Sequence, residues 1–201
     1  MPDKRDRKKS ELKARLLDAA RETIARDGLD ALRARDLAER VGCATGTVYN
    51  LFNDLDDLIL HANAETMRQL GTALSAATAE TDPPETFEAL ALAYARFARE
   101  NLGLWNALFE HRMADGGRSP DWFLEGHMIL LDRVIDPLAH LDPSLSEEAL
   151  KLRARTYFAA VHGIVSITLQ DRFLGLPKDA LGSELREFVA QLTFSLATRP
   201  T

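Results

Sequence analysis

Residues 36–58 read DLAERVGCATGTVYNLFNDLDDL, and this stretch decides the fold. Its first part favours a helix that places Leu37, Ala38 and Val41 on one face. Gly42 follows directly and can adopt the left-handed conformation that ends a helix. After the turn, the apolar residues Val48, Leu51 and Phe52 are again spaced as on one face of a helix. The stretch therefore predicts two short helices joined by a tight turn.

The second of these helices has the composition of a helix that reads DNA. Val48, Leu51 and Phe52 would face the core, so the remaining side chains are left near the exposed side. In a helix-turn-helix, the N-terminal residues of the second helix meet base edges in the major groove. Small residues let the backbone approach, hydroxyls donate to phosphates, and Asn pairs with adenine. The predicted contacts are Ala44, Thr45, Gly46, Thr47, Tyr49 and Asn50.

The N-terminal segment, roughly residues 10–60, resembles the DNA-binding domain of the TetR family of transcriptional regulators. The resemblance is carried by Leu16–Ala20, Arg35–Gly42, Gly46–Tyr49 with Phe52, and Asp56–Leu58. It implies an N-terminal head of three helices that binds a palindromic operator in double-stranded DNA as a homodimer. It also implies a regulator, most often a repressor, and not an enzyme; an activator stays open.

The chain departs from the family pattern at three positions. Arg33 stands where Ser or Thr usually caps the helix before the turn, Ala44 replaces the usual Ser, and Leu55 replaces a Lys that often contacts phosphate. Fewer phosphate donors weaken non-specific affinity. Arg33 and Arg35 can restore part of this charge and join the predicted DNA contacts. An alternative stays open, in which a helical dimer binds small molecules but has lost DNA binding.

The charge of the chain is divided unevenly. Residues 1–53 contain 12 Lys and Arg and 9 Asp and Glu, which gives this part a charge of +3. The remaining residues contain 13 and 22, a charge of −9, so the net charge of the whole chain is −6. A basic head on an acidic body suits a protein that touches DNA at one end. The arm Lys4–Lys9 is expected to be disordered in solution and to reach a neighbouring groove. The alternative is a solubilising tail.

Several function classes are disfavoured by composition. The 201 residues contain one Cys, which excludes an intrachain disulfide and a Cys-rich metal site. No apolar run reaches the roughly 18 residues of a membrane span, and the first ten residues lack the apolar stretch of a signal peptide. The motifs G-x-S-x-G and H-E-x-x-H are absent from the sequence. We predict a cytoplasmic protein without cofactor, metal site, catalytic residues or membrane partner.

The helical periodicity extends along the whole chain, and it predicts an all-α protein of about nine helices. The DNA-binding domain is expected over residues 1–53, and a helical effector-binding and dimerisation domain over 54–201. Outside the helix-turn-helix, the expected helices are 10–27, 54–80, 84–101, 104–113, 120–140, 146–173 and 178–197.

The last two of these helices are apolar over more than one face. One face can pack on the body, and the other requires a partner, so we predict a homodimer through these helices. A wholly internal core is the alternative. Residues 160–164, AVHGI, resemble the "HG" motif in the C-terminal domain of one branch of the family, and Tyr94–Ala98 and Leu104–Trp105 also resemble that branch. His162 would form a structural hydrogen bond, or else contact a ligand.

The resemblance also implies a small-molecule cavity in the body. Effector binding there would shift the spacing of the two heads and release DNA, which is a shift between two populations. An apolar or aromatic effector is expected. Each aromatic side chain could instead be ordinary core. The candidate pocket residues are Tyr94, Phe97, Trp105, Phe109, Trp122, Phe123, His127, Phe158 and His162.

Overall fold

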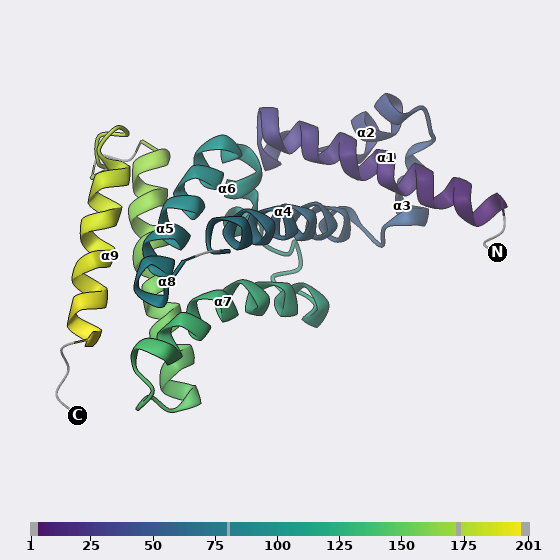
Figure 1. Cartoon of the computed structure of the whole chain (residues 1–201). Helices are drawn as coiled ribbons and strands as arrows, with labels where there is room; N and C mark the ends of the chain where they lie inside the picture. Colours follow the sequence, from purple (N-terminus) through teal and green to yellow (C-terminus); the bar gives the residue numbers. More distant parts are fainter. Residues whose placement is uncertain (1–3, 80, 172–173, 198–201) are drawn as a thin grey trace. The chain divides into compact units, whose positions relative to one another are not determined.

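The fold is seen in a computed structural model that describes residues 4–79, 81–171 and 174–197 (Figure 1). The side chains of 83, 84, 127, 129 and 195–197 lie outside this description. Within these limits every regular element is a helix, nine of them α and one 3-10, and none is a strand. The all-α prediction is therefore confirmed. No helix in the described ranges is long and apolar enough to cross a membrane.

The helices follow one another with short connections. In chain order they are α1 (Lys4–Asp27), η1 (Leu29–Ala31), α2 (Ala34–Val41), α3 (Thr45–Leu51), α4 (Leu55–Ala77), α5 (Pro83–Glu100), α6 (Leu102–Glu110), α7 (Asp121–Leu141), α8 (Glu147–Leu169) and α9 (Leu181–Ala197).

Backbone contacts divide the chain into two compact units. The head unit comprises residues 1–68 and 101–123, and the body unit comprises 69–100 and 124–201. Helix α4 contributes its first part to the head unit and its last part to the body unit. The predicted division of the chain is one of function, into a DNA-binding domain over residues 1–53 and an effector-binding domain over 54–201. That division stays a prediction.

The prediction of a disordered arm is wrong, because α1 begins at Lys4 instead of Ser10. Two interactions favour helix in the added turns. Arg7 Nε donates to Glu11 Oε1 at 3.0 Å across one turn of the helix. Asp6 lies in the first turn, where a carboxylate interacts favourably with the positive end of the helix dipole.

The turn between α2 and α3 forms as the sequence predicts. Gly42 has φ 78° and ψ 41°, in the left-handed region, and its N–H donates to the carbonyls of Ala38 and Glu39. The Cys43 N–H donates to the Ala38 carbonyl at 2.9 Å. Arg33 is the N-cap of α2 and makes no side-chain capping hydrogen bond, as expected from its departure from the family pattern.

One core holds the head unit together. Its centre is the apolar stripe of α1, against which α2, α3 and α6 pack. Each fully buried Leu or Ile in such a stripe contributes about 1.5–3 kcal/mol to stability. The core side chains are Leu16, Ala19, Ala20, Ile24, Leu32, Ala34, Leu37, Ala38, Val41, Val48, Phe52, Leu58, Ile59, Ala62, Leu104 and Ala107.

The body unit is organised by α5 and α9, which make extensive contact, with α8 packed on both. Phe87 and Ala91 on α5 meet Val189 on α9, Ala154 on α8 and Leu138 on α7. The Ser146 side chain accepts a hydrogen bond from the Ala149 N–H and caps α8.

The absence of a side chain at Gly103 allows α6 to approach the backbone of α1 closely. A Cβ at this position would lie 2.6 Å from the Ile24 carbonyl oxygen and 2.7 Å from that of Ala25. Because both atoms belong to the backbone, we expect Gly103→Ala to destabilise the protein by about 1–3 kcal/mol. Gly126→Ala is the matched control, since a Cβ there meets nothing within 4 Å; it should stabilise by up to about 1 kcal/mol. Urea unfolding measures both, and equal stability of the two variants would contradict this packing.

Candidate functional site

Helix α3 presents most of the predicted DNA contacts on one outward surface. Val48 and Phe52 are turned into the core at 1% and 2% exposure, and they fix the rotation of the helix. Tyr49 is 51% exposed, and a Cβ on Gly46 would meet nothing within 4 Å. Of the predicted α3 contacts, Ala44, Thr45, Gly46, Tyr49 and Asn50 are exposed and Thr47 is half-buried.

The two predicted arginines lie at the start of α2, and both are exposed. Arg33 Nη1 donates to the carbonyls of Asp30 at 2.6 Å and Leu32 at 2.8 Å, so one of its nitrogens is held against the preceding turn. Arg35 makes no hydrogen bond or ion pair within the described part of the chain. Arg40, one helical turn further along, is paired with Glu22. Arg35 is therefore the α2 cation whose charge is uncompensated.

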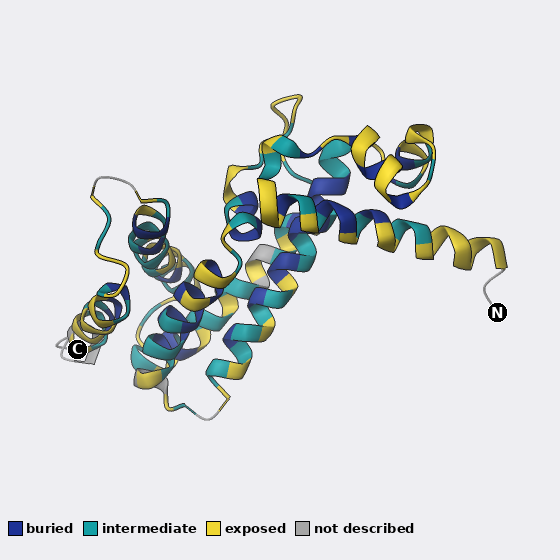
Figure 2. Cartoon of the chain, turned by 90° about the horizontal axis from the view of Figure 1, so that it is seen from above, coloured by how far each residue is buried: buried dark blue, intermediate teal, exposed yellow. Residues whose placement is uncertain are grey.

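The first two turns of α1 form a second basic surface; the sequence predicts a DNA contact for this segment, but as a disordered arm and not as a helix. All side chains from Lys4 to Glu11 are exposed, as Figure 2 shows at the N-terminal end. Arg5 and Lys9 continue the stripe of Leu12 and Leu16 at intervals of four, three and four residues. They therefore occupy the face that packs on the head core further along.

The next cations of α1 are engaged within the head unit. Lys13 Nζ lies 4.9 Å from the centre of the Phe52 ring and 3.3 Å from His61 Nε2. Arg15 Nη2 donates to the Val41 carbonyl at 2.7 Å. Neither hydrogen bonds nor ion pairs to Arg5 and Lys9 are found among the described residues. The charge available to a partner is thus concentrated at the start of the helix.

Reciprocal hydrogen bonds fix α4 directly behind α3. The Asp57 N–H donates to Asp54 Oδ1 at 2.7 Å, and the Asn53 N–H donates to Asp57 Oδ2 at 2.9 Å. The first bond is that of an N-cap, and the second is made to the residue before the cap, so the pair resembles a capping box with two carboxylates at the positive end of the helix. Sequence reasoning missed it, although the spacing of Asp54 and Asp57 was the available signal.

Asp56 ties the same end of α4 to the segment after α6. Its Oδ2 accepts a hydrogen bond from the Ala114 N–H at 2.8 Å, and its Oδ1 lies 3.6 Å from His111 Nε2. The helix that follows α3 and the segment that follows α6 are therefore joined through one carboxylate.

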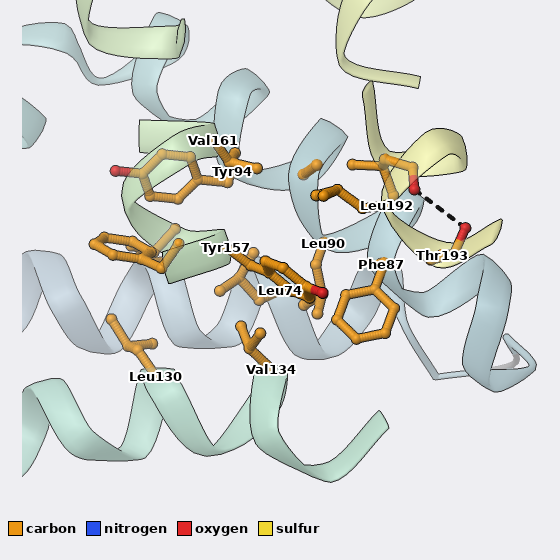
Figure 3. Close-up of a pocket in the computed structure, with 14 residues that line it drawn as sticks. Leu74, Phe87, Leu90, Tyr94, Leu130, Val134, Tyr157, Val161, Leu192 and Thr193 are labelled. Atoms are coloured by element: carbon orange, nitrogen blue, oxygen red, sulfur yellow. Dashed lines mark hydrogen bonds between the residues drawn. The ribbon is translucent and has the colours of Figure 1, made fainter. Parts of the chain in front are cut away.

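The body unit contains a cavity of about 80 Å³ between α4, α5, α7, α8 and α9 (Figure 3). This volume is several times the roughly 10–15 Å³ that one water molecule requires. The described side chains of the lining are almost wholly hydrocarbon, and none of them is charged. The residues are Leu70, Leu74, Phe87, Leu90, Ala91, Tyr94, Leu130, Val134, Tyr157, Phe158, Val161, Val189, Leu192 and Thr193.

Three of the predicted pocket residues come together at this cavity. Tyr94 and Phe158 line it. His162 lies beside them, with its Nδ1 2.7 Å from the Tyr94 hydroxyl and its ring stacked on Phe158 at 5.7 Å between centroids. The structural hydrogen bond expected of His162 is thus made within the body unit.

The other predicted pocket residues do not line this cavity. Phe97 is buried elsewhere in the body unit, and the side chain of His127 lies outside the described residues. The remaining four belong to the head unit: Trp105, Phe109, Trp122 and Phe123. Trp105 is 1% exposed there. The aliphatic lining was missed because Leu and Val at helical spacing are typical of any helical core.

Burial lowers the pKa of three histidines below the usual value. Loss of water is the largest cause for His61, with Lys13 acting in the same direction and Asp57 against it. Loss of water also lowers the pKa of His111, although Asp56 and Asp54 oppose it, and it alone lowers the pKa of His162. Across the described residues, no three His, Cys, Asp or Glu side chains gather closely enough to hold a metal ion.

Comparison with known families identifies both parts of the chain. Residues 16–62 match the family described as bacterial regulatory proteins, tetR family. Residues 87–192 match the tetracyclin repressor-like C-terminal domain. The first match runs from the middle of α1 into the first part of α4, and the second covers the larger part of the body unit.

Individual relatives agree with this result. The HTH-type transcriptional regulator BetI of Brucella anthropi is 29% identical over 100 residues, which are 48% of this chain and 52% of that protein. The chain thus spans about half the length of the curated relatives it matches. RolR, solved in complex with resorcinol, has a TM-score of 0.66 at 24% identity and 97% coverage of both chains. A protein of unknown function from Rhodococcus sp. RHA1 reaches 0.73 at 23% identity, with 90% of this chain and 94% of that chain covered.

The lowered histidine pKa values predict a stability that falls in acid. An unfolded histidine binds its proton near pH 6.5, whereas the buried ones bind it only at lower pH. The unfolded state therefore takes up more protons as the pH falls from about 7.5 to about 5.5, and the free energy of unfolding decreases. Urea unfolding at both pH values measures this change. His162→Gln should make the decrease smaller; an unchanged decrease would contradict the role of its burial.

Proposed function

Because the chain belongs to the TetR family of bacterial regulatory proteins, we propose that it is a ligand-responsive repressor of transcription. It binds a palindromic operator in the cytoplasm as a homodimer and is released by a small apolar or aromatic effector. The observation that carries this proposal is the outward surface of α3, where Thr45, Tyr49 and Asn50 are exposed around an open Gly46. The family is one of transcriptional regulators, in keeping with the prediction that the chain is not an enzyme.

The DNA contacts divide into two kinds. Asn50, Thr45 and the small residues Ala44 and Gly46 approach base edges, where sequence is read. The hydroxyls of Thr47 and Tyr49 and the guanidinium groups of Arg33 and Arg35 hold phosphates, which position the helix without reading sequence. Of the two arginines, Arg35 supplies the larger electrostatic contribution, because Arg33 already donates to two carbonyls.

The basic start of α1 adds a further phosphate contact. Arg5 and Lys9 lie on the face of α1 that is directed toward the rest of the head unit, and they have no acidic partner among the described residues. Two such cations release counterions from DNA and strengthen binding to every sequence.

The outer face of α8 supports the dimer. Leu152, Thr156, Ala159, Gly163 and Ile167 repeat at intervals of three and four residues, while Ala154 and Val165 face inward. Leu152 is 68% exposed, and a Cβ on Gly163 would meet nothing within 4 Å. Small residues at the centre of an apolar stripe allow a second helix to approach closely.

Helix α9 contributes less to this face than its sequence suggests. Its apolar side chains at Leu181, Leu185 and Val189 are buried in the core of the body unit. Among the described residues of α9, Phe194 is the one large apolar side chain that is exposed, at 70%. The outer side is otherwise largely polar. We therefore place the centre of the dimer interface on α8, with Phe194 adding to it.

An effector of low polarity suits the cavity described above. Its walls are hydrocarbon, and RolR, which has the same fold, was solved with an aromatic ligand. A second candidate function is a helical dimer that binds small molecules but no DNA. The observations that favour it are the missing side-chain cap on α3 and Leu55, which packs on the head core where a phosphate-binding Lys often stands in the family.

Selection of bound duplexes from a random-sequence library tests the regulator proposal and supplies the operator. We expect a single enriched palindrome. Replacing Thr45 and Asn50 together by Ala should abolish its selective binding, because these side chains approach the base edges. Arg35→Gln should instead weaken binding to all sequences and reduce the slope of log K against log salt by about 0.9. Lys9→Gln should reduce the slope by a similar amount.

The matched control for these charge changes is Arg99→Gln, an exposed arginine on α5 in the body unit. It should leave both the affinity and the salt slope unchanged. Absence of any enriched sequence, from a protein that is folded and dimeric, would reject the repressor and favour the second candidate function.

The dimer has its own test in Ile167→Glu. A carboxylate on the α8 stripe would be buried without a partner in the dimer, so we expect dimerisation to weaken by at least about tenfold. Met128→Glu, at a similarly exposed residue of α7, should leave it unchanged. Sedimentation velocity over a range of concentrations measures both. A dimer of wild-type strength in Ile167→Glu would place the interface elsewhere.

A further inference from the structure

The cavity of the body unit has an unusually simple polar chemistry. Of its lining side chains, only Tyr94, Tyr157 and Thr193 carry a polar atom, and all three carry a hydroxyl. Carboxylates, amines, guanidinium groups and amides are absent from the described side chains that line it. Any hydrogen bond from a lining side chain to a bound molecule must therefore come from one of these hydroxyls.

Two of the three hydroxyls are already engaged. The Tyr94 hydroxyl lies 2.7 Å from His162 Nδ1. Thr193 Oγ1 donates to the backbone of its own helix, with the carbonyls of Val189 and Ala190 both at 3.1 Å. Figure 3 shows the Tyr94 oxygen at the edge of the cluster of side chains. These two groups have little capacity left for a ligand.

The Tyr157 hydroxyl is different. Its ring packs edge-on against Phe87, with 6.4 Å between centroids, and Figure 3 shows its oxygen within the cluster of lining side chains. It has no hydrogen-bond partner among the described residues. A phenolic hydroxyl can donate one hydrogen bond and accept another, so it offers a ligand a single polar contact inside an apolar enclosure.

We propose that this cavity binds a neutral, mainly apolar molecule that carries one hydrogen-bonding oxygen, and that this oxygen pairs with the Tyr157 hydroxyl. The inference rests on the proposed function only in taking the cavity as the effector site. Charged ligands are excluded because an ionised group would lose its water and find no countercharge in the lining. A pure hydrocarbon would fit, but it would leave the Tyr157 hydroxyl unpaired.

Four probes with the same benzyl skeleton separate these cases: toluene, benzyl alcohol, benzoate and benzylamine. Isothermal titration calorimetry with the full chain gives the dissociation constant of each. We expect benzyl alcohol to bind most tightly and toluene next. Benzoate and benzylamine should bind weaker than benzyl alcohol by a factor on the order of 100.

Tyr157→Phe keeps the ring and removes the hydroxyl. It should weaken benzyl alcohol binding about 3- to 10-fold and leave toluene binding unchanged or slightly tighter. Thr86→Val is the matched control: it removes a hydroxyl from α5 at a residue that does not line the cavity, and it should not change the ratio of the two affinities. Ala91→Leu, which fills the cavity with three extra carbons, should abolish binding of both probes and so locate them. Thermal unfolding checks that each variant is folded.

The outcomes are distinct. An equal or tighter affinity for benzoate or benzylamine would overturn the inference, as would an alcohol-to-toluene ratio that Tyr157→Phe does not change. Failure of all four probes to bind would overturn it as well. Failure of the proposed function is recognised separately, because operator selection and operator affinity are measured without any ligand. If the chain binds benzyl alcohol through Tyr157 but enriches no palindrome, the inference about the ligand stands and the proposal of a repressor is rejected.

Discussion

The head unit depends on the burial of one stripe of α1. Leu16, Ala20 and Ile24 are fully buried, and the helices that meet them come from both ends of the head sequence: α2 and α3 follow α1 directly, whereas α6 begins at Leu102. Because one stripe serves all of these partners, the rotation of α3 and the seating of α6 are fixed by the same side chains. A change in how α6 packs on α1 therefore acts on the helix that carries the DNA-reading surface.

The body unit obeys a different constraint. Apolar contacts join its helices, and the large side chains Phe87, Tyr157 and Phe158 line a space between them. Interiors normally pack to the density of organic crystals. An apolar cavity is poorly hydrated, and the atoms that line it lack van der Waals partners on one side. An apolar ligand can supply these missing contacts. The apolar cavity itself is therefore sufficient to bind the proposed effector.

The sequence predicts the head better than the body, for a physical reason. The turn at Gly42, the inward Val48 and Phe52, and the outward Tyr49 and Asn50 follow from local spacing and backbone preference, and they are found as predicted. The cavity depends on which helices are neighbours. Trp105 and Phe123 look like pocket residues in the sequence, yet both residues belong to the head unit. Leu74 and Val134 look like ordinary core in the sequence, yet both line the cavity. The start of α1 was predicted as a disordered arm because a run of cations has no apolar periodicity, although the spacing of Arg7 and Glu11 already favoured a helix.

The early start of α1 gives this helix two levels of local stability. Its residues up to Glu11 are exposed, and the first buried side chain is Leu16. The opening turns are held by little more than their own backbone hydrogen bonds, and an unpacked segment of this length is marginal as a helix in water. Amide hydrogen exchange along α1 then follows a gradient, from near-solvent rates at Lys8 to protection by the whole core at Ile24. A rigid reading head thus carries a basic extension that can fray and refold without disturbing the core.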